Sequence, residues 1–129
     1  MKRVLFVCVE NSCRSQIAEA FARMHGEGAI EPYSAGSKPA GQVNPKAIES
    51  VREVGYDLSR HVSKSLSEIP AIEFDVAVTM GCGDACPNAR TKQREDWNIP
   101  DPKALPTDEF RKVRDQIEQR VKELLIRLG

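Results

Sequence analysis

The sequence predicts an α/β fold, an open and doubly wound sheet of four parallel strands with helices on both faces. Two short apolar runs, residues 4–8 and 74–80, are rich in β-branched and aromatic residues, as strands buried on both faces are. Other segments repeat apolar residues with the helical period of about 3.6. Because strands and helices alternate, we expect a parallel sheet with ligands binding beyond the carboxyl ends of its strands.

The expected elements cover the chain from end to end. The second helix has clear start signals, because Asn44 is a preferred N-cap and Pro45 suits the first helical position. Gly26 and Gly55 suit the ends of the first two helices. In order, we expect strands over residues 4–8, 29–34, 74–80 and 95–98, helices over residues 15–25, 45–54 and 107–128, and one helical turn over residues 64–69.

Length and composition limit the classes of function. The 129 residues are expected to form one domain, residues 1–129. Lys plus Arg and Asp plus Glu each total 19, so no net charge favours nucleic acid or a membrane as partner. The first apolar run is too short for a signal peptide or a membrane span, so we expect a cytoplasmic protein. We also expect a monomer that needs no cofactor. Four cysteines then indicate catalysis, redox exchange or metal binding.

Residues 8–14, between the first strand and the first helix, are called the oxyanion loop below. The unpaired N–H groups and positive dipole end of a helix favour an anion there. Arg14 offers a planar fork of donors to that anion, and Cys8 is the expected nucleophile, whose thiolate the positive groups stabilise. Ser15 can donate a hydrogen bond to the sulfur. The residues expected to bind the oxyanion are Val9, Glu10, Asn11, Ser12, Cys13 and Arg14.

Two features of this loop have other interpretations. The alternative without function is that Cys8 is a small core residue and Arg14 a solvated charge. Against it, strand, loop and helix follow one another in the order that an anion site requires. The charge of Glu10 opposes an anion unless its side chain points to solvent.

The segment Cys8-Val-Glu-Asn-Ser-Cys-Arg-Ser resembles the phosphate loop of low-molecular-weight protein tyrosine phosphatases and of the thioredoxin-coupled arsenate reductases built on the same fold. The resemblance implies a phosphatase I-like, flavodoxin-like fold, with Asp101 as the general acid that protonates the departing oxygen. It extends over nearly the whole chain, through Ser34-Ala35-Gly36, Val43-Asn44-Pro45-Lys46-Ala47, Val78-Thr79-Met80, Trp97 and Asp101-Pro102.

Cys82 and Cys86 distinguish the two families. A phosphatase has no use for two further thiols, whereas a reductase must supply two electrons and can end as a disulfide. The resemblance implies a relay in which Cys8 attacks arsenate and Cys82 attacks Cys8, releasing arsenite. Cys86 then moves the disulfide to Cys82–Cys86, and thioredoxin reduces it. We therefore expect an arsenate reductase of arsenic detoxification, with weak phosphatase activity.

Three alternatives remain for the cysteines. The first is a phosphatase acting on phosphotyrosine, and the second is a zinc or redox-sensing module, because the cysteine spacings are near those of zinc ligands. The third concerns Cys13, a bystander or the partner of Cys8 in a protective disulfide. Only three residues separate Cys82 from Cys86, fewer than in the best-known reductases, but one helical turn still brings Cα atoms near the ~4.4–6.8 Å that a disulfide needs.

Some arsenate reductases of this family bind potassium near the loop, through residues that correspond to Asn11, Glu19 and Ser34 and an aspartate after a His-x-Ser sequence. Here Lys64 follows His61-Val62-Ser63. We predict that the Lys64 ammonium replaces the ion, pairs with Glu19 and helps to hold Asn11, so no metal is expected. The plain alternative is a solvated surface lysine.

Overall fold

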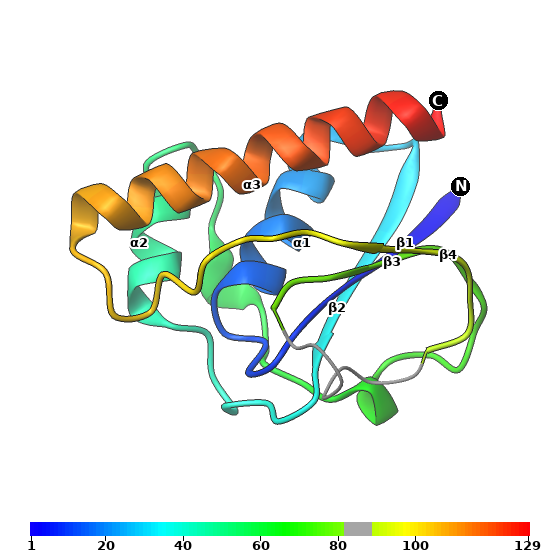
Figure 1. The fold of residues 1–129 in the computed structure, drawn as a ribbon, viewed down its shortest axis with the longest axis horizontal. Helices are drawn as coiled ribbons and strands as arrows, with labels where there is room; N and C mark the ends of the chain where they lie inside the picture. The colour runs from blue at the N-terminus through cyan, green and yellow to red at the C-terminus, as the bar shows by residue number, and fades with distance from the viewer. Residues whose placement is uncertain (82–88) are drawn as a thin grey trace.

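The computed structural model describes residues 1–81 and 89–129, and its centre is one sheet of four strands in the order β2-β1-β3-β4 (Figure 1). Each neighbouring pair is parallel, which confirms the predicted α/β class. The strands are β1 (Lys2–Cys8), β2 (Ile30–Gly36), β3 (Phe74–Thr79) and β4 (Thr91–Asp96); the α-helices are α1 (Arg14–His25), α2 (Pro45–Arg52) and α3 (Thr107–Leu128); and two 3-10 turns are η1 (Leu58–Arg60) and η2 (Leu66–Glu68).

The long helices lie together on one side of the sheet. Val4 and Phe6 of β1 point to this side and share a buried cluster with Phe21 of α1 and Ile117 of α3. Helix α3 crosses the whole molecule and packs against both α1 and α2 (Figure 1). Its apolar stripe, as the sequence predicts, is the buried face of the helix.

The opposite face of the sheet has a smaller cover. Leu5 and Val7 alternate with the residues just named and point to this second side, where Ala77 of β3 joins them. Ile69 and the partly buried Leu66 pack over them. Among the described residues the helical cover of this face is the single turn η2 rather than a long helix.

Strand β4 differs from its predicted position. The sequence suggests residues 95–98, whereas the strand begins at Thr91 and ends at Asp96. Its residues are mostly polar and exposed because β4 is the edge of the sheet, so it lacks the alternation that identifies a strand. Trp97, which follows it, is buried in the core 5.9 Å from the Phe6 ring, measured between ring centroids.

The topology places a ligand crevice beside Cys8. From β1 the chain passes to β2 on one side of β1 and later to β3 on the other. Parallel sheets bind ligands at such a switch point, outside the carboxyl ends of the strands. The segment after β3 begins beside the carboxyl end of β1, since the Met80 N–H donates to the Val7 carbonyl at 2.8 Å.

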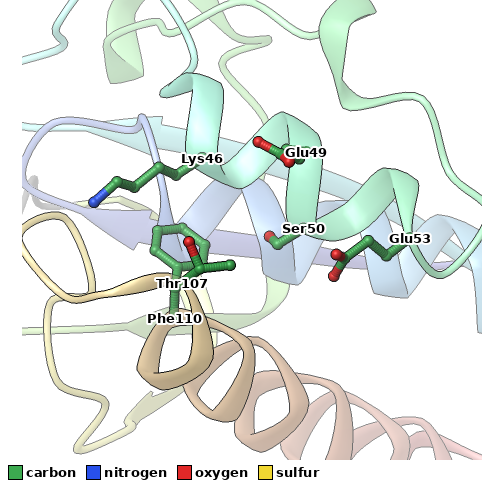
Figure 2. Close-up of a pocket in the computed structure, with 6 residues that line it drawn as sticks. All are labelled: Lys46, Glu49, Ser50, Glu53, Thr107 and Phe110. Carbon is green, nitrogen blue, oxygen red and sulfur yellow. The ribbon is translucent and has the colours of Figure 1, made fainter.

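A second hollow, between α2 and the start of α3, is too small to hold a substrate. It encloses about 20 Å³, roughly the space of one water molecule. Figure 2 shows the side chains that line it, which are Lys46, Glu49, Ser50, Glu53, Thr107 and Phe110. It is an imperfection in helix packing.

Candidate active site

A cavity of about 350 Å³ opens at the carboxyl end of β1. Its wall combines the oxyanion loop with two residues that come from elsewhere in the chain, Gly81 after β3 and Asp101 before α3. The lining residues are Cys8, Val9, Glu10, Ser12, Cys13, Arg14, Gly81 and Asp101. The structure therefore brings the predicted nucleophile, arginine and acid to one cavity.

The backbone of the oxyanion loop is held from outside by the segment 38–44. The carbonyl groups of Val9, Glu10 and Ser12 accept hydrogen bonds of 2.8–2.9 Å from the N–H groups of Lys38, Ala40 and Asn44. In a trans peptide the N–H points away from the carbonyl, so the next N–H groups along the loop point to the opposite, inner side. Converging N–H groups of this kind form an anion site.

Ser15 connects the cysteine to a buried amide. Its Oγ lies 2.9 Å from Cys8 Sγ and accepts a hydrogen bond of 2.8 Å from Asn11 Nδ2. Since that oxygen already accepts from Asn11, its own proton is available to the sulfur. A thiolate at Cys8 can accept this hydrogen bond, which gives the predicted role of Ser15 a geometric basis.

Asn11 has the most demanding position in the loop. Its φ of 50° is in the left-handed region, and it is the one non-glycine residue with positive φ among those the structure describes. Its fully buried side chain accepts from Gln16 Nε2 at 2.8 Å and from the Lys64 N–H at 2.9 Å. The side chain thus pairs with the backbone between η1 and η2 and holds the loop in its curled form.

We expect Asn11→Ala to lower the free energy of unfolding by about 2–4 kcal/mol, because it strains the backbone and leaves buried donors unpaired. Asn11→Gly is the matched control, since glycine accepts positive φ but also lacks the amide. Urea unfolding should place the glycine variant about 1 kcal/mol above the alanine variant. Equal stabilities would show that backbone strain contributes nothing at this position.

Arg14 stands at the other end of the oxyanion loop from Cys8, and contacts from the segment before α3 hold its side chain over the cavity. Its Nη1 donates to the Ile99 carbonyl at 3.0 Å, and its Nη2 lies 3.9 Å from Asp101 Oδ2. The side chain is 10% exposed, so little solvent screens its charge. Gly81 lies directly against the guanidinium.

Lys103 is a residue of the rim that sequence reasoning missed. Its Nζ contacts both carboxylate oxygens of Glu10, at 2.8 and 2.9 Å, and this pairing raises the pKa of the lysine. Its backbone N–H donates to Asp101 Oδ1 at 3.0 Å. Glu10 therefore points to the rim of the cavity, where a cation compensates its charge. A lysine two positions after the acid was a weak signal in the sequence.

Cys13 lines the cavity but is a poor nucleophile. Burial raises the pKa of its thiol to about 12, an effect that the hydrogen bond from Ser12 only partly offsets. The thiol therefore stays protonated at neutral pH, in agreement with the bystander interpretation. A disulfide between Cys13 and Cys8 is absent from this structure, in which both are free.

Lys64 lies where the resemblance predicts a substitute for potassium. Its Nζ is 3.4 Å from Ser34 Oγ, 3.2 Å from the Val62 carbonyl and 3.8 Å from Glu19 Oε1. Ser34 Oγ also donates to Glu19 Oε1 at 2.6 Å. Burial lowers the pKa of Lys64, while the Glu19 carboxylate opposes that shift. The Lys64 ammonium thus lies near three oxygens, with 22% of the side chain exposed.

Two candidate residues of the proposed relay cannot be placed in the cavity. Cys82 and Cys86 lie outside the described residues, although Gly81, the neighbour of Cys82 in sequence, is part of the cavity wall. Within residues 1–81 and 89–129, no three His, Cys, Asp or Glu side chains lie together as a metal site would need. None of the helices in this part of the chain is long and apolar enough to cross a membrane.

The fold and the cavity together define a class of α/β proteins that hold a cysteine and an arginine at the two ends of one anion-binding loop. The chain belongs to the low molecular weight phosphotyrosine protein phosphatase family, whose sequence pattern it matches over residues 3–129. The family predicted from the oxyanion loop is therefore confirmed.

Several proteins similar to this chain are arsenate reductases. The chain is 40% identical to a glutaredoxin arsenate reductase of Synechocystis, over the full length of both. An arsenate reductase solved in its phosphate-binding state superposes with a TM-score of 0.88 at 38% identity, covering 100% of both chains. A thioredoxin-dependent arsenate reductase of Corynebacterium glutamicum gives a TM-score of 0.80 at 32% identity, covering 99% of this chain and 62% of the other.

Proposed function

We propose that this protein reduces arsenate to arsenite in the cytoplasm with its own thiols, and that thioredoxin restores them. One observation carries the proposal: Gly81 lines the oxyanion cavity, and the residues that follow it in the sequence are Cys82-Gly-Asp-Ala-Cys86. A loop that binds an anion, combined with two further thiols in the same chain, suits a two-electron reduction better than a hydrolysis. The names of the relatives at 32–40% identity support the same substrate.

The first step is a displacement at arsenic. Arg14 and the loop N–H groups bind the tetrahedral anion, and Cys8 Sγ attacks the arsenic atom with Ser15 stabilising the thiolate. The oxygen that leaves is the one facing away from sulfur, on the side of Asp101. Asp101, which is exposed beside Arg14, protonates it so that it departs as water.

The later steps move electrons through the cysteines. Cys82 attacks Cys8 Sγ, a sulfur–sulfur bond forms, and the sulfur–arsenic bond breaks with its electron pair staying on arsenic. Arsenite leaves, and Cys86 takes over the disulfide with Cys82. An external dithiol then supplies two electrons to that disulfide. Thioredoxin is our candidate, and the Synechocystis relative makes glutaredoxin the reductant to compare.

The test is NADPH consumption on addition of arsenate, in one arm with thioredoxin and its reductase and in another with glutaredoxin, glutathione and glutathione reductase. Turnover in the first arm, absent in Cys8→Ser, is the expected result. Turnover in the glutaredoxin arm alone keeps the reductase and changes its reductant. No turnover in either arm, with brisk hydrolysis of an aryl phosphate, identifies a phosphatase instead.

We also propose that the Lys64 ammonium takes the place of a potassium ion in supporting Asn11. Turnover is therefore expected to be the same in sodium and potassium buffers of equal ionic strength, because a cation already fills the site. Lys64→Ala should create a requirement for potassium, seen as several-fold higher turnover in potassium than in sodium. Potassium activation of the unaltered protein would contradict this role.

A further inference from the structure

The rim of the oxyanion cavity carries an ion pair that joins its two halves. Glu10 belongs to the oxyanion loop, whereas Lys103 belongs to the segment that contains Asp101, more than 90 residues later. The lysine contacts both oxygens of the carboxylate. Glu10 lines the cavity, and the two side chains are 37% and 54% exposed, so the pair lies at the surface beside the cavity.

The position of this pair relative to Asp101 bears on which substrates fit. Lys103 is fixed to the acid by its N–H bond to Asp101 Oδ1 at 3.0 Å. In the proposed reaction the departing oxygen faces Asp101. In a phosphate or arsenate ester that oxygen carries the organic group, which must leave the cavity past the same carboxyl group. An ester therefore meets the Glu10–Lys103 bridge, whereas a free oxyanion ends before reaching it.

The composition of the cavity wall agrees with this arrangement. Its lining residues include no aromatic ring against which the ring of an aryl ester could stack, a statement that covers the described residues. Trp97, the nearest candidate in sequence, is buried against Phe6. The site thus offers an ester no compensating contact for opening the rim.

We propose that the Glu10–Lys103 ion pair is the specificity-determining closure of the cavity, which admits a free tetrahedral oxyanion and disfavours its organic esters. This inference rests on the proposed function for its biological meaning, because selectivity for arsenate over phosphoproteins is what a reductase needs. The pair adds no net charge to the rim, so it acts through the space it spans. A free oxyanion and an ester analogue of similar charge therefore provide the comparison.

The experiment measures dissociation constants by calorimetry for inorganic phosphate and for benzylphosphonate, an unreactive analogue of phenyl phosphate. Glu10→Ala/Lys103→Ala keeps the net charge and removes the bridge. We expect it to bind benzylphosphonate about three- to fivefold more tightly relative to phosphate, the range for loss of one exposed ion pair. The charge-exchanged pair, Glu10→Lys/Lys103→Glu, should restore the original ratio because it rebuilds the bridge.

Glu109→Ala/Lys112→Ala is the matched control, since it removes an exposed Glu–Lys pair on α3 that is remote from the cavity. Its ratio should equal that of the unaltered protein. A ratio that stays constant in Glu10→Ala/Lys103→Ala, or both ligands weakening by the same factor, would overturn the proposal. Because binding needs no thiol relay, a shifted ratio in a protein that never turns over arsenate would retain the closure and reject the reductase.

Discussion

Cys82→Ser and Cys86→Ser are each expected to abolish multiple-turnover arsenate reduction while leaving aryl phosphate hydrolysis close to that of the unaltered protein. Hydrolysis needs the oxyanion loop, Cys8, Arg14 and Asp101, which these changes leave in place. Reduction also needs two electrons, which the thiols give up by forming a disulfide. Without both later thiols this disulfide cannot form at Cys8–Cys82 and then be transferred to Cys82–Cys86. The coupled NADPH assay and a chromogenic phosphate ester measure the two activities separately.

The two variants should differ in a single turnover. Cys86→Ser is expected to release one equivalent of arsenite and to end as a Cys8–Cys82 disulfide, which peptide mass spectrometry identifies. Cys82→Ser should release none, because no thiol then attacks Cys8. The relay is wrong in its proposed order if Cys82→Ser releases arsenite and forms a Cys8–Cys86 disulfide. Full NADPH turnover by either variant would remove the substituted cysteine from the mechanism.

Most of the site that the sequence predicts is made by neighbours in the chain, and the resemblance adds the distant Asp101. Cys8, Asn11, Arg14 and Ser15 belong to one strand–loop–helix unit, so local signals and resemblance suffice to place them. The position of Lys64 was also predictable, because a resemblance to potassium-binding relatives pointed to the place at which the residue type changes. Its observed contacts with Ser34 and Glu19 agree with that expectation.

The unpredicted features depend on contacts between distant segments. The Arg14 guanidinium is held by the Ile99 carbonyl, 85 residues away, and a backbone carbonyl leaves no signal in residue type. Glu10 and Lys103 are 93 residues apart, and charged residues are common on surfaces, so their pairing was not evident. Strand β4 was displaced for a related reason, since an exposed edge strand carries no apolar pattern.

Gly81→Ala is expected to lower kcat/KM for arsenate by about 100-fold, the usual effect of moving a binding group by about 1 Å. Gly81 has a φ of 78°, and a Cβ at this position would overlap Nη1 of Arg14 and lie 3.2 Å from its Cζ. The guanidinium must then leave the Ile99 carbonyl and the anion it faces. Because the backbone strain and the collision act at the same residue, the experiment has to separate them.

Gly55→Ala provides that separation. Gly55 has a φ of 96° with open space around its missing Cβ, so alanine there adds only the strain of positive φ, about 1–3 kcal/mol. Thermal unfolding should show both variants destabilised, whereas steady-state kinetics should show the loss of activity for Gly81→Ala alone. The loss should include a higher dissociation constant for inorganic phosphate, since Arg14 binds the anion before any chemistry. If phosphate binds Gly81→Ala as tightly as the unaltered protein, the guanidinium has kept its place. The glycine is then not needed for the position of Arg14.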